Sequence, residues 1–140
     1  MSEQSIPRTS ISVGRLVHAI LSADTAVSTM TGGHIFPSVK EVKVSPPYVC
    51  YQRVGTSETA VKSGRGADSC VVRCDCFGRS YNESVDLAEL VRAALETDGY
   101  PKDGGGLRAR SIIMTDSTDE FTDAGSGIYY EQVTFEMRIN

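Results

Sequence analysis

Four cysteines are the residues of this sequence best suited to nucleophilic or metal chemistry. Cys70, Cys74 and Cys76 all have even numbers, so in a regular strand they share one face with Val72. We interpret them as small, core-facing thiols, a common role for free cysteine. A zinc site that adds Cys50, a disulfide and a redox role stay open as alternatives. The spacing C-x3-C-x-C lacks the C-x2-C knuckle that wraps a tetrahedral zinc ion, which disfavours the zinc alternative.

Two histidines are the only side chains available for acid–base chemistry near neutral pH. His18 falls on the flank of a predicted helix, and His34 follows a Gly-Gly turn. A surface or capping role suits both better than catalysis. Because no nucleophile stands beside a base in the pattern, the sequence does not predict a Ser-His-Asp or Cys-His site. We therefore do not expect an enzyme.

Two Gly-rich stretches are candidate phosphate sites, and one acidic stretch is a candidate cation site. The segments 64–66 and 104–106 lack both phosphate-loop patterns, G-x-x-x-x-G-K-[ST] and G-x-G-x-x-G. The acidic stretch misses the D-x-[DN]-x-[DN]-G register of a calcium loop. Its acidic residues are Asp116, Asp119, Glu120 and Asp123. We predict a solvated loop there, and no cofactor or metal in the chain.

An aromatic and basic sheet face would suit single-stranded nucleic acid. Tyr48, Tyr51, Arg53 and Arg73 are the residues that could form one. The net charge of −4, the pI near 5.1 and Asp75 on the same strand argue against it. The same charge offers no general attraction for an anionic membrane. We expect no specific nucleic-acid binding and no membrane association.

A chain of 140 residues is about the size of one domain, so we predict a single domain over residues 1–140, with 1–9 as a flexible arm. No stretch approaches the ~18 apolar residues of a membrane span. The first residues lack a basic start followed by an apolar core, so no signal peptide is expected. Synthesis in the cytoplasm follows from this interpretation.

Helical periodicity occurs in three places. A helix from Ser10 carries one apolar stripe, and a short helical turn capped by Ser22 or Asp24 should follow it to Met30. After the capping box Ser80–Glu83, a longer helix carries a second stripe. The first stripe is Val13, Leu16, Val17, Ile20 and Leu21; the short turn should bury Ala26, Val27 and Met30; the last stripe is Ser84, Leu87, Ala88, Val91, Ala94 and Leu95. Asp86, Glu89, Arg92 and Glu96 should face water.

Strands are predicted at 48–54, 70–77, 107–114 and 128–139, with a brief extended segment at 34–37. In the last strand we expect one dry and one wet face. The dry face has Tyr129, Val133, Phe135, Met137 and Ile139, and the wet face has Glu131, Thr134, Glu136 and Arg138. Polar loops should cover 55–69 and 115–127. The predicted fold is α+β, a mainly antiparallel sheet of about four strands with two amphipathic helices packed on one face.

The order of these elements and several short segments together resemble the tail-completion or tail-terminator proteins of long-tailed bacteriophages and their prophages. The segments are Gly33-His34-Ile35-Phe36-Pro37, Pro47-Tyr48-Val49-Cys50-Tyr51, Arg73-Cys74-Asp75-Cys76-Phe77-Gly78, Tyr81-Asn82-Glu83, Leu87-Ala88 and the strand from Tyr129 to Ile139. The resemblance covers roughly residues 12–139. It implies a structural subunit of the virion tail that forms a ring, typically a hexamer. The ring stops polymerisation of the tail tube protein and meets the head connector proteins, and DNA passes through its lumen.

A ring of identical chains needs two different patches that meet head to tail. We hypothesise that loop 55–69, with Lys62 and Arg65, and loop 115–127, with Asp116, Asp119 and Glu120, form subunit or tail-tube contacts. The lumen should be neutral or acidic so that DNA phosphates slide past. A head–tail connector or stopper protein of the same virion and a generic soluble protein-binding module remain alternatives.

Overall fold

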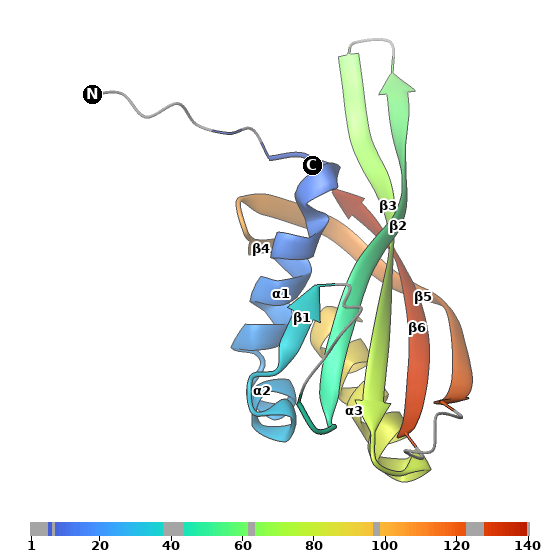
Figure 1. The fold of residues 1–140 in the computed structure, drawn as a ribbon. Coiled ribbons are helices and arrows are strands. Elements are labelled where there is room, and N and C mark those ends of the chain that lie inside the picture. The colour runs from blue at the N-terminus through green and yellow to red at the C-terminus, as the bar shows by residue number, and fades with distance from the viewer. Residues whose placement is uncertain are drawn as a thin grey trace.

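The structure is a computed structural model that describes residues 6, 8–37, 44–61, 64–96, 99–122 and 128–139, without the side chains of 57–61, 64–67 and 122. The described chain has an α+β fold in which helices cover one face of a curled sheet (Figure 1). Its helical elements are the 3-10 turn η1 (Ser10–Ser12), α1 (Val13–Ala23), α2 (Thr25–Thr31) and α3 (Tyr81–Glu96). Its strands are β1 (Ile35–Pro37), β2 (Tyr48–Val61), β3 (Gly64–Gly78), β4 (Lys102–Gly104), β5 (Leu107–Thr122) and β6 (Ile128–Ile139).

The first two helices follow the apolar periodicity of the sequence. The predicted stripe of α1 is buried, except that Ile20 is only partly covered. Asp24 ends α1 and caps α2, because its carboxylate accepts the N–H of Val27 at 3.0 Å. Gly32 closes α2 with a φ of 64°, a left-handed conformation that glycine adopts without strain. Ala26, which we expected to be buried, is exposed.

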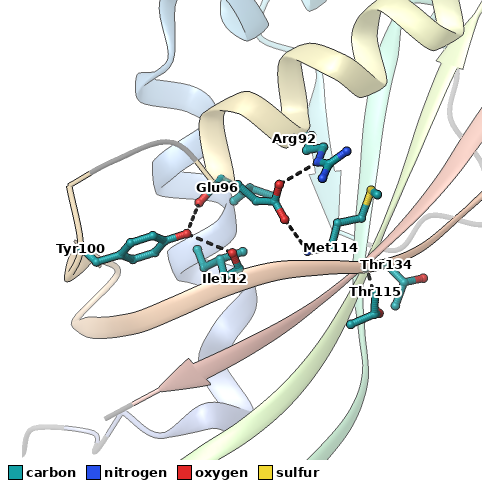
Figure 2. Close-up of polar contacts among 8 residues, drawn as sticks. Arg92, Glu96, Tyr100, Ile112, Met114, Thr115 and Thr134 are labelled. Atoms are coloured by element: carbon teal, nitrogen blue, oxygen red, sulfur yellow. Dashed lines mark hydrogen bonds and ion pairs between the residues drawn. The ribbon is translucent and has the colours of Figure 1, made fainter.

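Helix α3 begins at the predicted capping box. The hydroxyl of Ser80 accepts the N–H of Glu83 at 3.1 Å, and the carboxylate of Glu83 reaches back to the N–H of Arg79 at 2.9 Å. The whole predicted stripe of α3 is buried. Glu96 corrects the expectation that it faces water. It is half-buried, pairs with Arg92 at 2.7 Å and accepts the N–H of Met114 on β5 (Figure 2).

Six strands form one sheet in the order β1-β2-β3-β6-β5-β4. The β1–β2 pair is parallel and the other pairs are antiparallel. The expected mainly antiparallel sheet is therefore confirmed, but the expected number of about four strands is too low. The two added strands, β1 and β4, have three residues each, which is too short for a periodic pattern in the sequence.

Both predicted polar loops are largely strand, and the expectation is wrong there. Residues 55–61 and 64–69 extend β2 and β3 into a long hairpin, which projects beyond the helices in Figure 1. Residues 115–122 continue β5 alongside β6. The side chains of 115–121 are all exposed. A strand that buries neither face shows no apolar alternation, which is the signal that sequence interpretation depends on.

The core lies between the helices and the inner face of the sheet. Cys70, Cys74 and Cys76 are fully buried there beside Val72, as the shared parity of these positions predicted. The base of the projecting hairpin, hereafter the β2–β3 arm (residues 55–69), is joined to the N-terminal turn. There the Ser10 hydroxyl donates to the Asp68 carboxylate at 2.5 Å, with both side chains buried.

Candidate assembly interface

The structure places the predicted contact residues on two strands. Arg65 lies in β3 near the tip of the β2–β3 arm, where its backbone is opposite Ala60. Lys62 lies outside the described residues. Asp116, Asp119 and Glu120 are exposed on β5. Residues 116–121, which also include Phe121, are called here the acidic end of β5.

The basic and acidic sets are not brought together within one chain. The strand register places Arg65 beyond Asp68, which is opposite Ile139 at the last residue of β6. Glu120 instead pairs with Tyr130, near the first residue of β6. The two sets therefore lie toward opposite ends of the sheet, so any pairing between them must join two chains.

A buried carboxyl group lies beside the acidic end of β5. Glu131 is only 8% exposed and is paired with Asp119 across the β5–β6 ladder. Burial, a hydrogen bond with Asp119 and the charges of Asp119 and Glu120 raise the pKa of Glu131 to about 7. The Tyr81 hydroxyl at the start of α3 is 3.5 Å from the Asp119 carboxylate.

The expectation that Glu131 lies on the wet face of the strand is wrong. Its parity matches that of Val133 and Phe135, both buried, so strict alternation would have placed it on the helix side. The expectation followed the charge of Glu131, whereas its position in the alternating pattern indicates the buried face.

Both long outer strands have open edges. On one side of the sheet, β1 covers only Val49 to Tyr51 of β2. On the other side, β4 covers only Leu107 to Ala109 of β5. In the described parts of the chain, no strand pairs with the outer edge of β2 from residue 52 onward or of β5 from residue 110 onward. Apart from the C=O of Ile112 and the N–H of Met114, which are bonded to the Tyr100 hydroxyl and the Glu96 carboxylate, such backbone groups can pair with a strand of another chain.

A hollow of about 670 Å³ lies beside the open edge of β2. It is formed where α1 faces the end of β1 and the adjoining part of β2. Its walls include Ile11, Gly14, Arg15, His18, Ala19 and Tyr51. The hollow joins segments distant in sequence, so no local motif could have indicated it.

The helix-free face of the sheet carries a row of aromatic rings. Tyr48 stacks on Phe77 with ring centroids 4.7 Å apart, and Phe77 stacks on Tyr130 at 4.8 Å. Tyr51, by contrast, packs in the core on the helix side. Its β2 neighbour Arg53 is paired with Val72, another core residue, and so shares that side. The candidate nucleic-acid-binding residues Tyr48, Tyr51 and Arg53 therefore do not share one face of the sheet.

The thiols are placed where nucleophilic chemistry is unfavourable. Burial raises the pKa of the Cys74 thiol to about 12, helped by the charge of Asp75 and by Cys50. Burial also raises the pKa of Cys76 and, less strongly, that of Cys70. His18 is half-buried near Tyr51, with ring centroids 6.0 Å apart, and the exposed His34 stacks on Phe36.

The described residues offer neither a metal-binding cluster nor a membrane-spanning helix. Within the described ranges, no group of three or more His, Cys, Asp or Glu side chains is placed to hold a metal ion. Nor is any helix of the described chain long and apolar enough to cross a bilayer.

Comparison with known proteins identifies one family, and solved structures with a similar fold include the following two. A family model described as tail completion protein gp17 matches residues 15–140. A chain from the virion of a native gene transfer agent particle shares the fold, with a TM-score of 0.73 and 15% identity over 91% of this chain and 96% of that chain. A second solved chain is 12% identical over 85% of this chain and 88% of its own, and its TM-score of 0.49 is too low to support an argument. No curated protein matches the sequence.

Proposed function

This chain belongs to the tail completion protein gp17 family, and from that premise we propose that it closes into a ring at the end of the phage tail tube nearest the head. The chain is a structural component of the virion tail. In the proposed role, the ring ends tube polymerisation and forms the joint to the head connector. The likeness to a chain of a gene transfer agent virion supports this environment.

The observation that carries the proposal is the pair of open edges. They lie on opposite sides of one sheet, so the edge of β2 in one copy can meet the edge of β5 in the next. Such a contact joins two different patches, head to tail, and closes into a ring when the rotation between copies divides a full turn. A hexamer is the symmetry we propose.

The β2–β3 arm provides a second contact. The outer backbone groups of two strands that project beyond the helices can pair with a strand of a neighbouring chain. We assign the arm, with Arg65 near its tip and Lys62, to contact with the adjoining subunit or the tail tube.

The arm assignment predicts that shortening the arm abolishes assembly and preserves the fold. Replacing residues 59–67 by Asn-Gly keeps Glu58 opposite Asp68 and closes the hairpin with a favourable two-residue turn. Asp68 also keeps its bond to Ser10. We expect a melting temperature close to that of the parent, no rings by native mass spectrometry, and no capped tubes by electron microscopy.

Asp86→Asn on the exposed side of α3 serves as the control and should assemble like the parent. Rings of the shortened variant that still cap tubes would refute the arm assignment. Parent rings that bind portal-bearing heads and leave tubes uncapped would favour a connector or stopper instead. A parent that stays monomeric and binds neither would favour a generic binding module.

A further inference from the structure

The hollow beside the open edge of β2 has largely apolar walls that no other described residue covers. Ile11 on its rim is 72% exposed, an unusual state for a large aliphatic side chain next to other apolar groups. Tyr51 closes the inner wall and Ala19 lies on the α1 side. A concave apolar surface of this kind favours burial of an aromatic or aliphatic side chain.

The hollow also adjoins a part of β2 with which no described strand pairs on the outer side. Strand β1 ends at Pro37, opposite Tyr51, while β2 continues to Val61. A strand that takes over where β1 ends would pair with β2 and turn every second side chain toward the helix side. Those side chains would enter the hollow.

We propose that this hollow receives the acidic end of β5 from a second copy of the chain. The inference rests on the proposed function, because it names the contact through which the ring closes. The direction of the strands suits such a contact. From β2 to β5 the sheet reverses direction three times, so β5 of a copy in the same orientation runs antiparallel to β2.

Phe121 is the side chain that fits the hollow. It is 51% exposed and is paired with Tyr129, two residues before the buried Glu131, which places it on the helix side of the sheet. Asp119 has the same parity. In a continued sheet, both side chains therefore face the helix side of the neighbour, where the hollow opens.

The charges of the two surfaces are complementary. Arg15, which is exposed, lines the hollow with His18, and Arg53 follows Tyr51 on the same face of β2. The entering segment carries Asp119 on the helix side. Asp116 and Glu120 add negative charge nearby, but their pairing with Thr134 and Tyr130 places them on the helix-free face. Opposite charges across an interface fix its register and disfavour the reverse pairing, in which like charges would meet.

The strand register sets the offset between the copies. Within one chain, Glu120 is level with Tyr48, through the pairs with Tyr130 and Phe77. Tyr48 lies before the part of β2 that β1 covers, so the second copy must be displaced along the strands for its acidic end to reach the hollow. A closed ring accommodates such a stagger when its strands are tilted to the ring axis.

Cross-linking tests the contact directly. Ile11→Cys and Phe121→Cys variants are purified separately, mixed, and treated with a short bismaleimide. The four native thiols, Cys50, Cys70, Cys74 and Cys76, are all buried and should react slowly. We expect covalent dimers from the mixture. A mixture with Ile113→Cys in place of Phe121→Cys is the control, because Ile113 is 59% exposed on β5 outside the acidic end.

Association of Phe121→Ser provides the second measurement. We expect ring formation to weaken by about tenfold or more, with Ile113→Ser close to the parent. If the parent forms rings while Phe121→Ser assembles equally well and no cross-link forms, this contact is wrong and the ring proposal stands. If the parent does not assemble at any concentration or on tail tubes, both proposals are wrong.

Discussion

Glu131 is a carboxyl group whose environment differs strongly from water. It is buried beneath α3, where Asp119 and Glu120 add negative charge and Tyr81 approaches Asp119. Glu131 lines a small cavity of about 70 Å³ together with Glu89 and Arg92 of α3. Ionisation of Glu131 therefore opposes the fold, since the charged form loses water and meets like charge.

The pH dependence of stability follows from that raised pKa. In the unfolded chain Glu131 loses its proton near its usual pKa of 4.5, and in the folded chain near about 7. The folded state thus binds more protons between these values, so the contribution of Glu131 is fully favourable below pH 4.5 and is lost as the pH rises to 7. Glu131→Gln should be more stable than the parent at pH 8, by roughly 2–4 °C in Tm for each kcal/mol gained.

Thermal unfolding at pH 4.5, 6 and 8 checks this prediction. The gain of Glu131→Gln should grow across the series and be small at pH 4.5. Glu136→Gln is the matched control, since Glu136 is an exposed residue of the same strand. An equal effect of Glu131→Gln at all three pH values would contradict the proposed environment.

The junction of β3 and α3 depends on a close backbone approach at Gly78. A Cβ atom there would lie 2.5 Å from the backbone nitrogen of Ser84 and 3.0 Å from the carbonyl carbon of Glu83. Ser84 is buried in the first turn of α3, so the helix cannot move away freely. The strand and the helix can therefore be joined this tightly only by glycine.

Gly78→Ala should destabilise the fold by about 2 kcal/mol, because the backbone must shift to relieve the overlap. Gly55→Ala is the control, as a Cβ at Gly55 meets nothing within 4 Å. Urea unfolding of the two variants measures the difference. Equal midpoints for both alanine variants would show that the junction can relax.

The same element-level view explains which parts of the fold could be predicted. Helices α1 and α3 and the strand around Cys70 to Cys76 each bury one face, so their periodicity is visible in the sequence. The acidic end of β5 has no such face, because its side chains are all exposed. The polar composition of this segment and of the arm is typical of a loop, although hydrogen bonds to neighbouring strands hold both extended.

The candidate interface was predictable only in part. The acidic residues of β5 are exposed as expected, and a role in contacts remains a prediction for them. The hollow depends on how Ile11, Pro37 and Tyr51 meet in the folded chain, which no sequence spacing encodes.

For the whole molecule, the open edges of β2 and β5 allow both specific assembly and unwanted aggregation. Unpaired strands invite uncontrolled association. Register shifts interrupt both, between Arg53 and Gly55 in β2 and between Met114 and Asp116 in β5. Such bulges twist a strand locally and limit the length of a flat edge. The geometry is thus compatible with an edge that accepts a staggered, specific partner and rejects indefinite stacking.

The charge of the whole molecule leads to a prediction for DNA. A ring through which DNA slides must not hold phosphates, because each phosphate neutralised by a cation adds to the affinity. With 18 acidic and 14 basic residues, the chain has a net charge of −4. We expect the assembled protein to bind a short duplex more weakly than about 10⁻⁴ M at physiological salt, below the usual range of non-specific binding. Fluorescence anisotropy of a labelled duplex measures this, with the same titration at low salt as the control. Micromolar affinity that falls steeply with added salt would mean that the lumen carries a basic lining, which the proposed passage of DNA does not allow.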